Sequence, residues 1–151
     1  MLGIDTNLLL YSLNPASSHQ PAAERFLRFS FRDKSETVAV SDYVLVELYN
    51  HLRNQVVMKK PLGAREAVEI VTAYWKIPNV TRIEHASVMD EVWKVASGIG
   101  FARRRIFDVR LAKTLRHHGV THFATANVKD FEGLGFEKVW NPLKDDEQRS
   151  A

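Results

Sequence analysis

The sequence predicts a three-layer α/β/α fold in which a parallel sheet is covered by helices on both faces. Short apolar runs alternate with longer helical patterns about five times along the 151 residues. Strands that are joined through helices pair in parallel, and helices then cover both faces of the sheet. Because 45% of the residues are hydrophobic, a chain of this length can build a sizeable core of its own.

Five segments have the character of short, buried strands. They are brief and rich in apolar and β-branched residues. We expect strands at residues 2–4, 37–40, 80–83, 120–125 and 137–140. The first of them ends at Asp5, and Asn127 lies just past the end of the fourth.

Helical patterns fill the intervals between these strands. Apolar residues recur at every third or fourth position, and capping residues mark several ends. Ser41, Ser87 and Asp108 are expected to begin helices, and Gly119 is expected to end one. We expect helices at residues 7–13, 21–29, 42–52, 64–75, 88–95 and 108–118.

The chain is predicted to form a single domain over residues 1–143, followed by a polar tail over residues 144–151. It contains no cysteine, which excludes disulfide scaffolds, thiolate nucleophiles and cysteine zinc sites. Its apolar runs stay well short of about 18 residues, so we expect no membrane span. The start of the chain lacks the basic region of a signal peptide, and we therefore expect a cytoplasmic protein.

Three acids stand where apolar or neutral residues would be expected. Asp5 follows the first strand, Glu47 lies beside the apolar face of its helix, and Asp108 precedes the inward-facing Leu111. Taken singly, Asp5 and Asp108 could be helix caps, and Glu47 could reach water from the edge of its apolar face. Ligands of parallel sheets gather at the carboxyl ends of the strands, which makes a shared site possible.

If the three carboxylates lay side by side, their mutual repulsion would have to be offset. At about 4–5 Å each pair would repel by roughly 3–4 kcal/mol at an effective dielectric constant of about 20. Three such pairs approach the whole stability of a domain, so protonation or a cation would be needed. Oxygen ligands without cysteine suit Mg²⁺ or Mn²⁺ better than zinc.

The segment around Asp108 is strongly basic, although the whole chain carries a net charge of only +3. Asp108 is the one acid between residues 101 and 118. A basic surface beside a carboxylate is expected where a polyanion is held over a metal site. A solvated helix face and loop would also explain it. The basic residues are Arg103, Arg104, Arg105, Arg110, Lys113 and Arg116.

Five short motifs follow one another in order along nearly the whole chain. They are residues 4–7 (Ile-Asp-Thr-Asn), 41–48, 106–112, 125–131 and 139–142. With these motifs the sequence resembles the PIN-domain nucleases, specifically the VapC-like toxins of bacterial toxin–antitoxin pairs.

This resemblance implies a PIN-like fold with a parallel five-stranded sheet and a pocket for Mg²⁺ or Mn²⁺. It implies a metal-dependent endoribonuclease, acting as the toxin of a type II toxin–antitoxin pair, with an RNA substrate of the tRNA or rRNA class. It also implies a homodimer and a cognate antitoxin protein that blocks the site. By position, Asp5 and Asp108 would bind the metal and Glu47 would orient or activate a water. Residues 103–105 and Arg110 would hold the RNA backbone.

Four further polar residues belong to the site that the resemblance implies. Asn7 and Thr125 would support the ligands through hydrogen bonds. Family members often have a fourth acid where this sequence has Asn127. Asp130 could approach the pocket in its place, or it could cap the next turn. We therefore expect one tightly held ion, with a second recruited alongside RNA.

Other functions also fit the sequence. One is a PIN-fold module that binds RNA or a protein with weak or no catalysis, and another is a housekeeping RNA-processing nuclease. His118 and His122 are four residues apart, but Gly119 breaks the helix that would align them on zinc. The sequence has no nucleophile elbow and no dinucleotide fingerprint. Asn7 stands where an aspartyl-phosphate phosphatase usually has a second Asp.

Overall fold

The computed structural model describes residues 1–144 and contains a five-stranded sheet. The strand order is β3-β2-β1-β4-β5, and every neighbouring pair is parallel. The strands are β1 (Leu2–Ile4), β2 (Val38–Ser41), β3 (Val80–Ile83), β4 (His122–Ala124) and β5 (Lys138–Trp140). The prediction of a parallel five-stranded sheet is confirmed.

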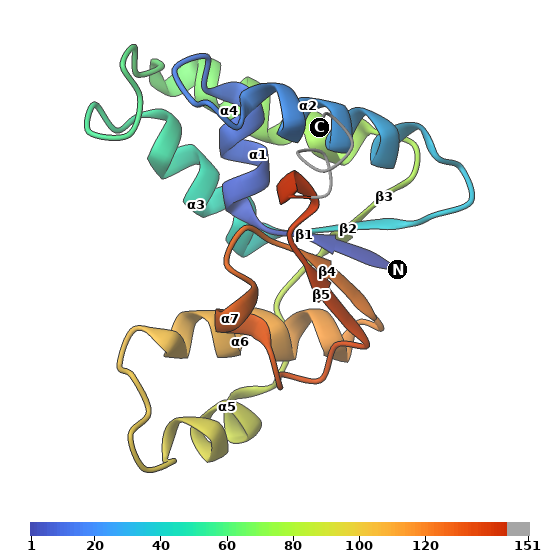
Figure 1. The fold of residues 1–151 in the computed structure, drawn as a ribbon, viewed down its shortest axis with the longest axis vertical. Helices are drawn as coiled ribbons and strands as arrows, with labels where there is room; N and C mark the ends of the chain where they lie inside the picture. The colour runs from blue at the N-terminus through green and yellow to red at the C-terminus, as the bar shows by residue number, and fades with distance from the viewer. Residues whose placement is uncertain (145–151) are drawn as a thin grey trace.

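Helices cover both faces of this sheet. Figure 1 shows α1 to α4 on one side of the strands and α5 to α7 on the other, which confirms the three-layer architecture. The helices are α1 (Thr6–Leu13), α2 (Gln20–Arg32), α3 (Asp42–Leu52), α4 (Ala64–Ala73), the 3-10 turn η1 (Tyr74–Lys76), α5 (Met89–Ala96), α6 (Arg105–His117) and α7 (Val128–Phe131). Within residues 1–144, no helix has the length and apolar character that crossing a membrane requires.

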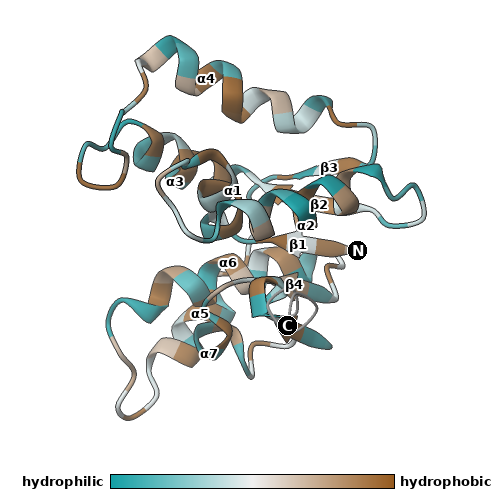
Figure 2. Cartoon of the chain, turned by 45° about the horizontal axis from the view of Figure 1, so that its top comes forward, coloured by the Kyte–Doolittle hydropathy of each residue, from teal (hydrophilic) through white to brown (hydrophobic). Residues whose placement is uncertain are grey.

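The core lies between the sheet and the two helical layers. β1 and β2 are buried at every position, and Figure 2 shows the hydrophobic colouring of β1 between the layers. Leu8 and Leu48 are fully buried in α1 and α3, while Leu115 of α6 and Phe123 of β4 are buried with them. Burial of one such side chain contributes roughly 1.5–3 kcal/mol. The packing therefore holds the strand ends in fixed positions.

The direction in which strands are added reverses between β1 and β4. From β1 the chain adds β2 and β3 on one side, and it then returns to add β4 and β5 on the other side. Ligands of open parallel sheets bind outside the carboxyl ends of the strands at this reversal. Asp5 follows β1 and Thr125 follows β4, so both residues flank this position.

Two of the expected helix caps are wrong, and one helix was not expected. α6 begins at Arg105, so Asp108 lies in its first turn and is not its cap. Arginine and isoleucine are good or neutral helix formers, which lets the helix start before the acid. α5 begins at Met89 with Val88 at the N-cap, so Ser87 does not cap it. The short helix α7, which follows Asn127, is absent from the expected set.

The predicted domain boundary at residue 143 falls at the end of the described chain. Residues 145–151 of the predicted polar tail lie outside the described residues.

Candidate active site

Asp5 lies where β1 ends and α1 begins. It is the N-cap residue of α1, and its Oδ1 accepts a hydrogen bond of 2.8 Å from the N–H of Thr6. The capping interpretation of Asp5 is therefore correct for one of its two oxygens. Asp5 is only 7% exposed, however, and aspartate is seldom so deeply buried unless it has partners.

The second oxygen of Asp5 connects the ends of two neighbouring strands. Asp5 Oδ2 accepts hydrogen bonds from Thr125 Oγ1 at 2.6 Å and from Asn7 Nδ2 at 3.1 Å. Asn7 Oδ1 accepts a bond of 3.2 Å from the N–H of Ala126, and Thr125 Oγ1 accepts one of 3.0 Å from the N–H of Asn127. The structure thus brings Asn7 and Thr125 into direct contact with Asp5, and the backbone after β4 holds both in place.

Glu47 approaches the same place from α3. Its Oε2 accepts a hydrogen bond of 2.9 Å from the hydroxyl of Thr6. Thr6 therefore binds Asp5 through its backbone and Glu47 through its side chain. The sequence pattern gave no role to Thr6. Its position between Asp5 and Asn7, within the motif of residues 4–7, is the signal that could have found it.

The carboxylate of Asp5 is strongly perturbed. Its pKa is raised from 3.8 to about 6, and burial is the largest cause. The hydrogen bonds from Thr125 and Thr6 lower this pKa, and the negative charges of Glu47 and Asp108 raise it. The three acids are therefore close enough for their charges to interact.

Asp108 shows the same kind of perturbation. Burial, as the largest cause, and the charges of Asp130 and Glu47 together raise its pKa from 3.8 to about 6, against a lowering by the charge of Arg105. Asp130 lies in α7, so its charge reaches Asp108 from a fourth element. We refer to Asp5, Glu47, Asp108 and Asp130 as the acidic cluster.

Arginines surround the start of α6. Residues 103–104 are exposed in the approach to this helix, and Arg110 is exposed in its second turn. Arg105 donates a hydrogen bond of 3.4 Å to the carbonyl of Glu132, and its positive charge lowers the pKa of Asp108. Arg105 is therefore close enough to influence Asp108, and the exposed arginines lie at or near the start of the same helix.

Comparison with known proteins decides the family. The family model of the PIN domain matches residues 3–137. This chain belongs to the PIN domain family. Ribonuclease VapC24 of Mycobacterium tuberculosis is 45% identical to this PIN domain over 146 residues, which are 97% of this chain and 99% of the relative. The resemblance to VapC-like PIN-domain nucleases is thereby confirmed.

Solved structures agree on the fold of this PIN domain. VapC20 of Mycobacterium tuberculosis, described as a sarcin-ricin loop cleaving toxin, superimposes with a TM-score of 0.66 at 19% identity, covering 90% of this chain and 96% of its own. FitAcB of Neisseria gonorrhoeae superimposes with a TM-score of 0.59 at 18% identity. The superposition covers 94% of this chain and 98% of the FitAcB chain. At these identities the likenesses establish the PIN-like fold alone.

The family resemblance implies Mg²⁺ or Mn²⁺, and the donor set of this PIN domain fits such an ion. Within residues 1–144, no lysine, arginine or histidine forms an ion pair with the acidic cluster. Nor does that part of the chain contain three carboxylate, imidazole or thiolate groups arranged to hold a metal by themselves. Mg²⁺ needs no such cage, because it binds to one or two carboxylates and keeps water and substrate phosphate as its other ligands. Asp5 and Asp108 are suited to that role.

Asn127 marks a departure from the acidic pattern of the family. It is exposed at the N-cap position of α7, where its side chain makes no capping hydrogen bond. Asp130 lies inside α7 and does not cap a following turn. Asp130 is exposed, and its charge contributes to the raised pKa of Asp108.

Proposed function

We propose that this protein is a divalent-metal-dependent endoribonuclease that hydrolyses RNA phosphodiester bonds as the toxin of a toxin–antitoxin pair. The observation that supports the proposal is that the charges of Glu47 and Asp108 raise the pKa of Asp5, which lies at the reversal of strand order, although the three acids come from separate elements. Carboxylates whose pKa is raised by burial and by one another are typical of functional sites. The 45% identity to Ribonuclease VapC24 supports the reaction class.

Asp5 and Asp108 would hold Mg²⁺ or Mn²⁺. When bound, such an ion supplies positive charge that stabilises the attacked phosphate and makes a nearby water easier to deprotonate. Both carboxylates have to be ionised to bind it, so metal affinity increases as the pH rises through about 6. Thr125 and Asn7 orient Asp5 through hydrogen bonds, as outer partners commonly do around metal ligands.

Glu47 would orient the attacking water and accept its proton. The hydroxyl of Thr6 fixes Glu47 Oε2 and so restricts the direction in which the other carboxylate oxygen points. Residues 103–105 and Arg110 would hold the RNA backbone through charge-assisted hydrogen bonds to phosphate oxygens.

Cleavage of total RNA tests this function. The wild-type protein is incubated with RNA in Mg²⁺ or Mn²⁺, with an EDTA control and an Asp5→Asn variant. Asp33→Asn is a matched control, because Asp33 is a partly exposed acid at the C-cap of α2, outside the acidic cluster. We expect cleavage by the wild type and the Asp33 variant in metal, and none in EDTA or with Asp5→Asn. Equal activity in all samples would remove the proposed role of the metal and the acids.

The number of bound ions tests the role of Asn127. With an amide in place of the fourth acid, we expect one tightly held ion in the free protein and a second one only with RNA. Titration of Mn²⁺ with and without a non-cleavable RNA measures both numbers. Two ions bound to the free protein would refute this expectation.

We further propose a homodimer in the cytoplasm, a cognate antitoxin that blocks the site, and an RNA target of the tRNA or rRNA class. These properties rest on the family resemblance. Sequencing of RNA ends after controlled expression identifies the target, and relief of growth arrest by the product of an adjacent small gene identifies the antitoxin.

Asn127 also favours a second candidate, a PIN-fold module that binds RNA or a protein with weak or no catalysis. RNA binding that persists without any cleavage in Mg²⁺ or Mn²⁺ would support this candidate. A housekeeping RNA-processing nuclease differs from a toxin in that its expression would leave growth unaffected.

A further inference from the structure

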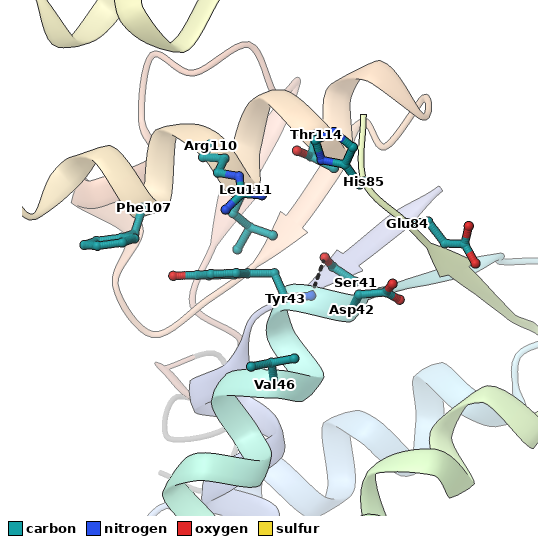
Figure 3. A pocket seen from close by; sticks show the side chains of 10 residues that line it. All are labelled: Ser41, Asp42, Tyr43, Val46, Glu84, His85, Phe107, Arg110, Leu111 and Thr114. Atoms are coloured by element: carbon teal, nitrogen blue, oxygen red, sulfur yellow. Dashed lines mark hydrogen bonds between the residues drawn. The ribbon is translucent and has the colours of Figure 1, made fainter. Parts of the chain in front are cut away.

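A separate hollow opens beside the acidic cluster, between α3 and α6. It has a volume of about 180 Å³. Figure 3 shows Tyr43 and Val46 of α3 facing Phe107, Arg110 and Leu111 of α6 across it. Pockets for drug-sized ligands measure roughly 300–1,000 Å³, so this hollow suits a single ring system.

The mouth of this hollow is apolar and exposed. Phe107 is 56% exposed and Val46 is 66% exposed, although both side chains are large and hydrophobic. Neighbouring exposed apolar side chains at a concave site, edged by polar groups, mark a place where a ligand binds. The exposed Arg110 supplies a positive charge at the same edge.

The hollow adjoins the residues that would cleave RNA. Val46 and Phe107 directly precede Glu47 and Asp108 in the chain. Burial raises the pKa of Tyr43, the charges of Glu47 and Asp108 raise it further, and that of Arg110 lowers it. The hydroxyl of Tyr43 therefore lies within electrostatic reach of both the acids and the arginine.

We propose that this hollow binds one nucleobase of the RNA, next to the phosphodiester bond that is cleaved. The inference rests on the proposed function and extends it to substrate selection. A base would stack on Phe107 and Tyr43, and Arg110 would contact the adjoining phosphate.

Polar groups along the lining of the hollow can form hydrogen bonds with the edge of that base. The Oγ of Ser41 accepts a hydrogen bond of 3.2 Å from the N–H of Tyr43, so its proton remains available to an acceptor on the ligand. Thr114 and His85 offer further donors and acceptors along the lining. The site therefore selects among bases and does not merely hold them.

Binding of nucleotides to the metal-free protein tests the site without any need for cleavage. Methyl NMR signals of Val46 and Leu111 are followed while each of the four ribonucleoside 5′-monophosphates is added, with ribose 5-phosphate as the control that lacks a base. We expect shifts at these methyls with at least one nucleotide, smaller shifts with ribose 5-phosphate, and loss of the effect in Phe107→Ala. Shifts confined to other methyls, or equal shifts with ribose 5-phosphate, would overturn the proposal.

Kinetics on RNA separate the subsite from the nuclease itself. We expect Phe107→Ala to raise KM roughly five- to tenfold, the loss expected for one base stack, and to weaken base preference beside the cleaved bond. Phe107→Trp should retain stacking and most of the affinity. Phe29→Ala is the matched control, because Phe29 is a phenylalanine of α2 that is 72% exposed.

Each outcome has a distinct meaning. If the wild type cleaves RNA and Phe107→Ala has the same KM and base preference, the subsite is wrong and the nuclease stands. If the wild type cleaves nothing but the nucleotide shifts occur, base binding stands and the proposed nuclease fails. If Phe107→Ala changes only the association of two copies in sedimentation, the hollow is a protein interface and the proposal is overturned.

Discussion

At the scale of single residues, Asp5 combines two roles that the sequence presents as alternatives. Oδ1 caps α1, and Oδ2 is held by Thr125 and Asn7 at the candidate site. The cap fixes the side chain in one direction. The capping hydrogen bond of Oδ1 thus positions Asp5 at the candidate site. Asp5 can therefore be both a helix cap and a site residue.

The raised pKa of Asp5 predicts how stability depends on pH. Because this pKa is about 6 in the folded protein and 3.8 in the unfolded chain, the folded state binds the proton more tightly. The stabilisation that comes from protonated Asp5 is fully present below about pH 4, and it is lost as the pH rises through about 6. Asp5→Asn removes the charge, and we expect the metal-free variant to be more stable at pH 7 by up to about 3 kcal/mol, because one pKa unit corresponds to about 1.4 kcal/mol. Urea unfolding of both proteins at pH 4 and pH 7 measures this difference in the free energy of unfolding.

Metal addition provides the control for that prediction. Mg²⁺ should raise the melting temperature of the wild type, because it binds the folded state, and it should have little effect on Asp5→Asn. A variant that is less stable than the wild type at pH 7, or one that Mg²⁺ stabilises equally, would contradict the argument.

Thr125 is predicted to be a positioning residue that sets the pH range of activity. Its hydroxyl lowers the pKa of Asp5, so Thr125→Val should raise that pKa. We expect cleavage several-fold below wild type at pH 6 and closer to wild type at pH 8. Thr125→Ser keeps the hydroxyl and should keep the wild-type pH profile. A uniform loss of activity at every pH would indicate a structural role alone.

At the scale of elements, the two ends of α6 show how local signals differ in strength. Its C-terminal end was expected at Gly119, and the helix does end there. Gly119 has φ +85°, a conformation that other residues rarely adopt. Its N-terminal end was expected at Asp108 and lies three residues earlier. A residue in the left-handed region stops a helix firmly, whereas an acid fits equally well at a cap or in the first turn.

Gly119→Ala measures this conformational requirement directly. No heavy atom lies within 4 Å of an added Cβ, so the cost comes from the backbone and not from a clash. We expect a loss of about 1 kcal/mol in the free energy of unfolding with an unchanged m-value. Gly119→Asn should recover part of the loss, because asparagine tolerates this region. If both variants match the wild type, the conformation of Gly119 is not a constraint on α6.

At the scale of the whole molecule, charge is arranged locally and not as an overall excess. The net charge is only +3, yet basic side chains gather at the start of α6 next to the acidic cluster. Such an arrangement attracts a polyanion to one place and leaves the rest of the surface mixed.

RNA affinity should therefore depend on salt through these arginines. Removing two phosphate contacts from a single strand lowers the slope of log affinity against log salt by about 1.4. We expect this change for the double variant Arg103→Ala with Arg104→Ala, and none for Lys59→Ala with Lys60→Ala, which removes the same charge from the loop after α3. Fluorescence anisotropy with a catalytically inactive protein measures it. Equal slopes for the two double variants would assign RNA binding to another surface.

Much of the fold could be predicted from the sequence. Every strand lies within two residues of its expected bounds, and Ser41 caps α3 as expected, because short strands and N-caps depend on neighbouring residues. The helix α7 spans only Val128–Phe131 and could not be predicted, because a single turn leaves no periodic pattern. Thr6 could not be assigned either, since its partner Glu47 is 41 positions away.

The sequence by itself determined the alternation of strands and helices, the acids that interrupt apolar segments, and the basic segment before and along α6. These properties follow from side-chain chemistry and from contacts within a few residues. The tertiary structure alone decided that Asp5 and Thr125, 120 positions apart, share a hydrogen bond, and that α3 and α6 enclose a hollow beside the acids. The physical reason is that strand order sets which carboxyl ends meet, and strand order results from the packing of the whole core and not from any local pattern.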